Sequence, residues 1–223
     1  MYIMDKLNIL YEDNHLIAIL KPAGVPVEPG GGSKPLTEYV RDYLREKYKK
    51  PGNIFLGIVH RLDQPVSGII VFAKTSKGAS RLSEQFRAGT VKKIYHALVA
   101  GEVKNGGEFS GFITKDLRKR TAEITEAGKA ARLKYEVIGL GSGKTLLRID
   151  LGTGRFHQIR AVLAGLGYPI EGDVKYGSST RLPEGEIALR ARELILKKAT
   201  TDETVTLRAP EAEWEVEFNK KRL

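Results

Sequence analysis

Short apolar runs broken by turn residues open the chain. Residues 7–11 and 16–20 are strand-like and flank a polar turn. The segment Lys21-Pro22-Ala23-Gly24 follows, and its proline and glycine predict a stiff loop. Apolar residues then recur at helical spacing from Leu36 onward, which predicts a helix with Ser33 as its N-cap. The pattern therefore changes from strands to a helix within the first 50 residues.

The rest of the chain contains mainly strand-like segments. The apolar runs 55–59 and 69–72 flank a charged segment, and a helix is predicted from an N-cap at Ser76 to a stop at Gly89. The remaining predicted elements are strands at 91–100, 108–114, 120–125, 131–138 and 144–151, a helix from about Phe156 to Gly165 or Gly167, a segment of undecided type at 186–196, and strands at 203–208 and 213–218.

The order of these elements favours one fold class. Strands and helices do not alternate regularly, and connections of hairpin length dominate the second half of the chain. Antiparallel strands can be joined by short hairpins, whereas parallel strands need long crossover connections. We therefore expect an α+β fold with a large mixed, mainly antiparallel sheet flanked by helices. The chain has no internal repeat and no long linker, so a single domain over residues 1–223 is expected.

Composition narrows the class of protein. The 223 residues include 37 Lys and Arg against 27 Asp and Glu, for a net charge of +10. Such an excess is compatible with a nucleic-acid partner and equally with a generically basic protein. The chain has no cysteine, which excludes disulfides, thiolate zinc sites and Cys nucleophiles. Neither a signal peptide nor a membrane-spanning run is present, so a soluble, cytoplasmic protein without a membrane partner is expected.

Three features of the sequence resemble known functional motifs but do not match the patterns that those motifs require. Residues 139–145 resemble a phosphate-binding loop, but Ile138 stands where the pattern needs glycine, and a strand follows instead of a helix. A Gly-rich hairpin turn is the better interpretation. The four histidines are not spaced as metal ligands, so no metal is expected. Ser67 lacks the glycine two positions before it that a nucleophile elbow requires.

A cluster of polar residues at the start of a predicted helix is more informative. Arg155, His157, Gln158 and Arg160 follow a glycine turn, and the next residues are too apolar for a helix exposed to solvent. An arginine that lines a cleft needs a carboxylate partner. Asp63, in the connection between two strands, is the natural candidate.

Tyr95 is a further candidate, on the strand predicted at 91–100. Alternation places Lys93, Tyr95 and Ala97 on one face of that strand. Taken alone, a tyrosine in such a strand is more often part of the core than of a catalytic site. Its interpretation therefore depends on the other motifs.

Several motifs together resemble the RluA-type family of RNA pseudouridine synthases, over roughly residues 7–210. The motifs are Lys21-Pro22-Ala23-Gly24, His60-Arg61-Leu62-Asp63 with Ser67-Gly68 and Ala73-Lys74, Lys93-Ile94-Tyr95-His96-Ala97-Leu98-Val99, and Gly154-Arg155-Phe156-His157-Gln158-Ile159-Arg160 with Gly172-Asp173 and Tyr176-Gly177. The resemblance implies the pseudouridine synthase fold with a central active-site cleft.

The resemblance also implies a reaction and the residues that perform it. Asp63 matches the catalytic aspartate, which attacks the ribose or initiates its deprotonation while the uracil detaches from N1 and is rejoined through C5. Tyr95 matches the tyrosine that packs against the flipped uracil, and Arg160 matches the arginine that pairs with the catalytic carboxylate. Arg61 matches a residue that enters the space left by the flipped nucleotide. No cofactor is implied.

Further residues of the same motifs are expected to contact RNA. They are His60, Lys74, Arg155, His157 and Gln158, in addition to Arg61. The expected partner is ribosomal or transfer RNA, bound by a monomer that needs no obligatory protein partner. The small N-terminal S4-type RNA-binding domain of many relatives is not recognised in this sequence, so the catalytic domain itself is expected to capture the RNA.

Three positions depart from the family pattern. Val66 stands where a threonine is common, and we expect this to adjust a turn without loss of activity. Arg190 replaces a usual histidine, and Ala209-Pro210 replaces a usual His-Pro pair, so residue roles near the C-terminus are less well defined.

Two other functions are compatible with parts of the sequence. A noncatalytic RNA-binding module with the same fold would bind RNA and form no pseudouridine. A glycoside-type hydrolase usually needs two carboxylates that flank the bond, and only Asp63 lies in such a motif.

Overall fold

The computed structural model describes residues 7–30, 32–49 and 51–221. These residues group into two compact units, which we call the first and second units. The first unit ends at Val91 and also includes Glu193–Ala209, and the second unit comprises Lys92–Arg192 and the residues from Pro210 onward. Strand β10 (Leu189–Lys197) contributes residues to both units.

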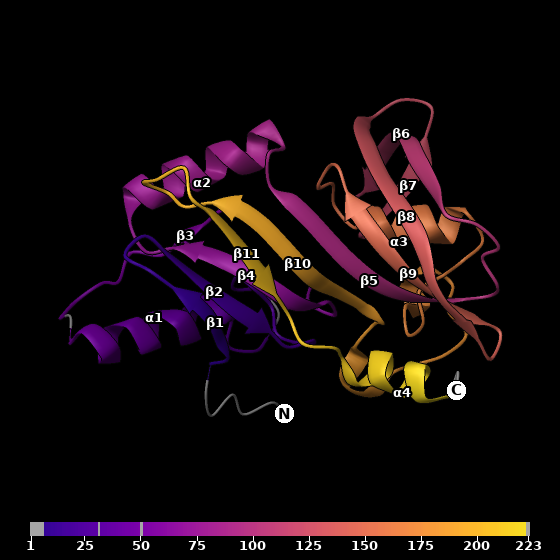
Figure 1. Cartoon of the computed structure of the whole chain (residues 1–223), viewed down its shortest axis with the longest axis horizontal. Helices are drawn as coiled ribbons and strands as arrows, with labels where there is room; N and C mark the ends of the chain where they lie inside the picture. Colours follow the sequence, from indigo (N-terminus) through magenta and orange to yellow (C-terminus); the bar gives the residue numbers. More distant parts are fainter. Residues whose placement is uncertain (1–6, 31, 50, 222–223) are drawn as a thin grey trace. The chain divides into compact units, whose positions relative to one another are not determined.

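The first unit is built on two buried antiparallel strands (Figure 1). In β4 (Ser67–Ala73) every residue is buried, and in β2 (Leu16–Lys21) only Leu20 is not fully buried. Their register places Ile17 opposite Phe72. Such continuous apolar runs are typical of strands that are covered on both faces. The shorter strands of this unit are β1 (Ile9–Glu12), β3 (Gly57–Ile58) and β11 (Thr204–Arg208).

Two helices complete the first unit, α1 (Leu36–Tyr48) and α2 (Ser76–Ala88). The fully buried Leu82 of α2 packs in a core with Leu16, Val71 and Leu194. Helix α2 ends at Gly89 in the left-handed conformation, as predicted.

The predicted N-caps were wrong by one or two positions. Thr75 caps α2, because its hydroxyl accepts a hydrogen bond from the backbone N–H of Gly78 at 3.0 Å. Pro35 occupies the cap position of α1 and makes no side-chain cap bond, so Ser33 does not cap that helix. Both errors arise because several cap-forming or proline residues precede each helix, and the sequence pattern does not rank them.

The second unit contains a five-stranded antiparallel sheet in the order β5-β9-β8-β6-β7. The strands are β5 (Lys92–Ala100), β6 (Gly107–Asp116), β7 (Thr121–Thr125), β8 (Lys129–Gly141) and β9 (Lys144–Leu151). Ser142 and Gly143 join the last two with φ angles of 53° and 67°, so the segment resembling a phosphate loop is a hairpin turn.

Helices of the second unit cover part of this sheet. Helix α3 (Gln158–Gly165) packs on β7, and a Cβ atom added at Gly165 would lie 2.7 Å from Ile124 Cδ1. Gly165 thus allows a close approach of the helix to the strand, and a larger residue would fit there only if the Ile124 side chain shifted. The unit also contains helix α4 (Glu213–Lys221) and the 3₁₀ turns η1 (Val174–Tyr176) and η2 (Pro183–Gly185).

The expected fold class is confirmed. Over the residues that the structure describes, the hydrogen-bonded strand order is β1-β2-β4-β10-β5-β9-β8-β6-β7, with β3 on β4 and β11 on β10. This order gives an 11-stranded sheet flanked by helices. The segment of undecided type at 186–196 is strand β10. The single domain and the central cleft stay predictions.

The strand predicted at 213–218 is wrong, because this segment forms helix α4. Trp214, Val216 and Phe218 alternate as in a strand, but Trp214 and Phe218 are also one helical turn apart and both are buried. Glu215 favours the helix, since its carboxylate accepts a hydrogen bond from the backbone N–H of Ala212 at 2.7 Å and so caps the helix.

Candidate active site

Asp63 lies on a tight turn in the first unit. The backbone carbonyl of Asp63 accepts a hydrogen bond from the N–H of Val66 at 3.1 Å, and Leu62 and Val66 are both buried. The flanking apolar side chains thus anchor the turn in the core, while the Asp63 side chain itself is half-buried. Burial of Val66 also explains why an apolar residue is accepted at this departure from the family pattern.

Lys21 ties a second loop to this turn. The Lys21 side chain is fully buried, and its ammonium group donates to the carbonyls of Pro22 at 2.8 Å and Gln64 at 3.0 Å. Gln64 and Gly24 exchange two more hydrogen bonds, each 2.9 Å long. A buried ammonium group is costly unless it is hydrogen-bonded, so this arrangement strongly favours one conformation of the residue that follows Asp63. The sequence pattern predicted a stiff loop here but gave Lys21 no role.

The other candidate residues of the first unit differ in exposure. The Arg61 side chain is 73% exposed and forms a surface ion pair with Glu28 at 3.1 Å. His60 accepts a hydrogen bond from the N–H of Val71 through Nε2 at 2.9 Å and stacks on Phe86 with ring centroids 4.6 Å apart. Arg61 is thus accessible to a ligand, whereas His60 contributes to the packing of the unit.

Lys74 is held inside a polar cluster. Its ammonium group contacts the Glu12 carboxylate at 2.6 Å, the carbonyl of Asp13 at 2.7 Å and the hydroxyl of Tyr48 at 2.8 Å. The side chain is only 9% exposed. These contacts favour a structural role for Lys74, and its contact with RNA stays a prediction.

In the second unit, Tyr95 lies within β5 and is buried to 9% exposure. Ile149 of β9 stands opposite it in the sheet. Lys93, two residues earlier, is half-buried, and this burial lowers the pKa of its ammonium group. The positive charge of Arg155 acts in the same direction, while Asp150 opposes it.

Arg160 is held by a buried ion pair within the second unit. Its guanidinium group donates from Nε and Nη2 to the two carboxylate oxygens of Asp173 at 2.6 Å and 2.8 Å. The side chains of Arg160 and Asp173 are 5% and 1% exposed. The guanidinium carbon also lies 4.8 Å from the centre of the Tyr176 ring. Asp173 belongs to the Gly172-Asp173 motif, but the sequence alone did not indicate that it orients Arg160.

His157 precedes helix α3 in the left-handed conformation, with φ 51°. Its Nδ1 atom and the hydroxyl of Tyr176 are 2.9 Å apart, and its ring stacks on Phe156. Burial, followed by the positive charges of Arg160, Lys175 and Lys115, lowers the pKa of His157 to about 3. The ring is therefore neutral at physiological pH.

Gln158 and Arg155 shape the turn before α3. The side-chain oxygen of Gln158 accepts hydrogen bonds from the Thr153 hydroxyl at 2.7 Å and the Arg155 N–H at 3.0 Å, and its amide nitrogen donates to the carbonyl of Arg132 at 3.0 Å. Gln158 is thus buried and organises this turn, and its contact with RNA stays a prediction. Arg155 is exposed, and its Nε donates to the carbonyl of Ala130 at 2.8 Å.

The two C-terminal departures from the family pattern meet in the structure. Arg190 is buried to 8% exposure, and its Nε donates to the carbonyl of Pro210 at 3.0 Å. Arg190 therefore contacts the residue that follows Ala209, through a backbone carbonyl that does not depend on which side chain stands at position 209.

The structure thus collects the candidate residues in two local groups. His60, Arg61 and Asp63 share one loop of the first unit, and Arg155, His157, Gln158 and Arg160 share the start of α3 in the second. Pairing of Asp63 with Arg160 stays a prediction. Within the described ranges, no group of three or more His, Cys, Asp or Glu side chains could hold a metal ion. No helix in the same ranges is long and apolar enough to span a membrane.

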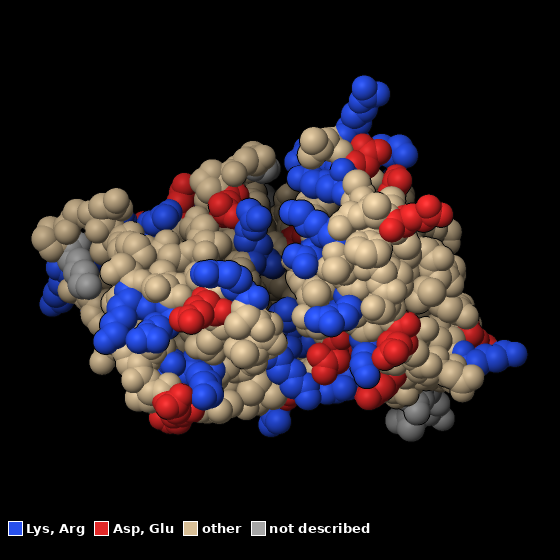
Figure 2. Space-filling view, turned by 90° about the horizontal axis from the view of Figure 1, so that it is seen from above, with Lys and Arg blue, Asp and Glu red and all other residues tan. Residues whose placement is uncertain are grey.

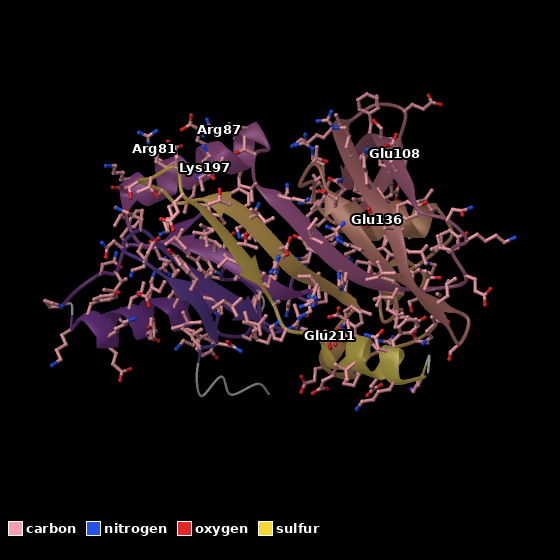
Figure 3. The ribbon with its side chains drawn as sticks, in the orientation of Figure 1. Arg81, Arg87, Glu108, Glu136, Lys197 and Glu211 are labelled. Atoms are coloured by element: carbon pink, nitrogen blue, oxygen red, sulfur yellow. The ribbon has the colours of Figure 1, made fainter. Side chains whose placement is uncertain are left out.

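Basic side chains are spread over the surface. Figure 2 shows Lys and Arg in several patches on the side where α2 lies, with acidic residues between them. Arg81 of α2 and Lys197 of β10 line a cavity of about 350 Å³ in the first unit (Figure 3). None of the predicted site residues lines this cavity, and Lys197 is already paired with Asp202 at 3.0 Å. The cavity is therefore distinct from the candidate site.

Comparison with known proteins gives a consistent result. Residues 15–165 match the family described as RNA pseudouridylate synthase. The chain is 37% identical over 180 residues to Ribosomal large subunit pseudouridine synthase D of Pseudomonas aeruginosa, covering 80% of this chain and 56% of that protein. The corresponding enzyme of Nitrosomonas europaea is 39% identical over 180 residues, with 79% and 52% covered. The chain thus spans little more than half the length of these relatives.

A shorter relative is matched over more of its length. The uncharacterized RNA pseudouridine synthase YhcT of Bacillus subtilis is 33% identical over 210 residues, which cover 92% of this chain and 68% of that protein. Among solved structures, human RNA pseudouridylate synthase domain containing 4 has a TM-score of 0.79 and 24% identity, with 96% of this chain and 92% of that chain covered. Human RNA pseudouridylate synthase domain containing 1 has a TM-score of 0.76, also at 24% identity, with 95% and 86% covered. At this identity the two structures show that the fold is shared.

Proposed function

Because the chain belongs to the family of RNA pseudouridylate synthases, we propose that it isomerises uridine to pseudouridine in structured RNA. The observation that carries this proposal is the family match over residues 15–165, a range that contains Asp63, Tyr95 and Arg160. The tight, hydrogen-bonded turn that holds Asp63 supports it, since a catalytic group must be fixed in position.

Asp63 is the proposed catalytic carboxylate. It attacks the ribose at C1′ or initiates the deprotonation of the sugar, and the bond between C1′ and N1 breaks. The uracil then turns and C5 bonds to C1′, which displaces the Asp63 carboxylate from C1′ in the first route, while in the second route the sugar regains the proton that was removed. The proton at C5 then leaves, and N1 gains a proton. The product is an isomer of the substrate, so the reaction needs neither an oxidant nor a cofactor.

Tyr95 and Arg160 are the proposed partners of Asp63. Tyr95 packs against the flipped uracil and accepts the proton from C5, and Arg160 keeps the carboxylate of Asp63 ionised by its positive charge. Flipping a base out of its stack costs a few kcal/mol. The exposed guanidinium of Arg61 can offset part of that cost by stacking in the vacated space.

Ribosomal RNA is the preferred substrate, and transfer RNA is the second choice. The two relatives from Pseudomonas aeruginosa and Nitrosomonas europaea are named for the large ribosomal subunit, and the net charge of +10 favours a polyanion. Unpaired loop nucleotides are the expected targets, because their bases are accessible. We further propose that the protein acts in the cytoplasm as a monomer without an obligatory protein partner.

The test compares Asp63→Asn with Asp202→Asn, a substitution of an exposed acidic residue, on ribosomal and transfer RNA that carry tritium at uridine C5. Isomerisation releases this tritium into water. We expect Asp63→Asn to abolish release while RNA binding persists, and Asp202→Asn to leave release unchanged. Release by Asp63→Asn at the wild-type rate would refute the assignment of Asp63. A wild-type protein that binds RNA but releases no tritium would be a noncatalytic module, and release of free uracil would indicate a hydrolase.

A further inference from the structure

Phe156 is an aromatic residue that the structure leaves partly exposed, at 38% of its surface. It lies on the turn between β9 and α3, between Arg155 and His157. A single exposed apolar residue is common and needs no explanation. The way in which this ring is supported is the informative feature.

One face of the Phe156 ring rests on a fixed support. The rings of Phe156 and His157 are stacked, with centroids 3.8 Å apart and an angle of 17° between their planes. His157 in turn contacts Tyr176, through its Nδ1 atom at 2.9 Å and in an edge-on ring contact at 5.6 Å. The Tyr176 hydroxyl also accepts a hydrogen bond from the N–H of Ala122 in β7 at 2.7 Å. The phenylalanine ring is thus preorganised, which reduces the entropy lost when a ligand binds.

An exposed lysine also lies over the Phe156 ring. The ammonium group of Lys115 lies 4.4 Å from the centre of the Phe156 ring. It must occupy the face opposite His157, because two groups at van der Waals distance cannot share one face. A cation–π contact between an exposed lysine and a ring strengthens an interaction only by roughly 2- to 5-fold. Stacking of a nucleobase on an aromatic ring is worth roughly 5- to 150-fold, so a base can displace the lysine.

The charges around this ring identify the kind of ligand. Lys115 lies over the ring and Arg155 precedes Phe156 in the chain, and both residues are exposed. The depressed pKa of His157, which burial lowers first and the charges of Arg160, Lys175 and Lys115 lower further, indicates a positive potential around its ring. An aromatic platform among cations matches a base with its flanking phosphates better than it matches an apolar peptide.

We propose that Phe156 is a stacking platform for an unpaired nucleobase of bound RNA, with Lys115 and Arg155 positioned to contact the phosphate beside that base. The proposal rests on the proposed function for the choice of RNA as the ligand. It adds Phe156 to the residues expected to contact RNA. Its neighbours Arg155, His157 and Gln158 were already expected to do so from the sequence motifs, but Phe156 was not.

The test measures binding of the full chain to a single-stranded oligouridylate and to a duplex RNA of equal length by fluorescence anisotropy. Phe156→Ala should weaken single-strand binding about 5- to 150-fold and leave duplex binding unchanged. Phe156→Trp should retain single-strand binding, whereas Phe156→Leu should lose it, because leucine is apolar but has no ring to stack. Phe55→Ala, which removes a ring that is 49% exposed in the first unit, serves as the matched control and should have no effect.

The salt dependence separates stacking from charge. Phe156→Ala should leave the slope of log affinity against log salt unchanged, and Lys115→Gln should reduce it by roughly 0.7 for single strands. Wild-type affinity of Phe156→Ala or of Phe156→Leu for the single strand would overturn the proposal. Tritium release is measured in parallel. If the wild type releases no tritium but Phe156→Ala still loses single-strand binding, the proposed function fails and the stacking site stands.

Discussion

Replacing Asp173 by asparagine should destabilise the second unit, because it removes the charge that balances a buried guanidinium group. Arg160 and Asp173 are 5% and 1% exposed, and two hydrogen bonds of 2.6 Å and 2.8 Å join them. Water therefore cannot replace the lost carboxylate. The remaining arginine keeps its positive charge, since its pKa is too high for it to lose a proton.

The expected magnitude follows from the burial of the pair. Removal of one partner of a buried ion pair costs about 3–5 kcal/mol. Asparagine keeps one acceptor oxygen for Arg160, so we expect the free energy of unfolding to fall by an amount near the lower end of this range, about 3 kcal/mol. For a chain of this length each kcal/mol lowers the unfolding temperature by roughly 2–4 °C, which gives a decrease of roughly 6–12 °C.

Calorimetric unfolding at pH 7 tests this expectation, with Asp202→Asn as the matched control. Asp202 forms an ion pair with Lys197 at 3.0 Å, but the two side chains are 97% and 59% exposed. Exposed pairs contribute at most about 1 kcal/mol, so the control should unfold within a few degrees of the wild type. If Asp173→Asn unfolds at the same temperature as the control, the buried pair does not stabilise the unit in the way its geometry indicates.

A double substitution separates stability from function. Arg160→Met combined with Asp173→Leu removes both charges and fills the site with apolar atoms, which is often neutral or stabilising for buried pairs. We expect this variant to unfold near the wild-type temperature but to lose isomerisation, because the proposed partner of Asp63 is gone. A stable and fully active double variant would show that Arg160 is structural only.

Two further predictions concern the first unit. Burial raises the pKa of Glu12, but hydrogen bonds from Lys47, Lys74 and two tyrosines overcome this and lower it to about 2. The resulting stabilisation, roughly 2–3 kcal/mol, should be complete above the ordinary pKa near 4.5 and lost as the pH falls toward 2, so wild type and Glu12→Gln should converge in urea unfolding at low pH. A constant difference across this range would contradict the prediction. Lys21→Met should remove the Lys21 donor from the carbonyls of Pro22 and Gln64, so that Gln64 keeps only the N–H of Gly24 as donor, and should lower kcat for tritium release more than it raises KM for RNA. An unchanged kcat would show that this loop does not position Asp63.

The sheet could be predicted from the sequence because its signal is local. Residues 69–72 form a continuous apolar run, and in the structure every residue of β4 is buried. Likewise, Ser142-Gly143 between two alternating segments specifies a hairpin without reference to the rest of the chain. The antiparallel pairing of β6 with β7 and of β8 with β9 then follows from the short connections between them, whereas the place of β10 between β4 and β5 does not.

Helix α4 could not be predicted by the same reasoning. Its apolar residues fit both a strand and a helix, and a distant contact contributes to the result. Glu215 accepts hydrogen bonds from the Ala212 N–H at 2.7 Å and lies 2.7 Å from His96 Nδ1 in β5, more than 100 residues earlier. The pKa of Glu215 is lowered although burial opposes this, because His96, the Ala212 N–H and Arg192 stabilise its charged form. Tertiary contacts of this kind leave no periodic signal in the sequence.

The motifs identified candidate residues but not their local partners. The pattern around Asp63 and Arg160 was sufficient to select both residues, because several motifs occurred together in one order. It did not reveal that Lys21 binds the carbonyl of Gln64 or that Asp173 holds Arg160, since each contact depends on how separate loops meet. Phe156 was overlooked for a different reason: whether an aromatic residue is exposed cannot be read from its neighbours in the sequence.

The pair of Arg160 with Asp173 is compatible with the proposed pairing of Arg160 with Asp63. A guanidinium group has five N–H donors, and Asp173 accepts from two of them, on Nε and Nη2. A guanidinium held in one orientation by a first carboxylate also loses less freedom when it meets a second one. Asp173 would then act on the reaction only through Arg160. Asp173→Asn should therefore lower tritium release by no more than Arg160→Met does, and a larger loss in the folded variant would show that Asp173 affects the reaction by another route.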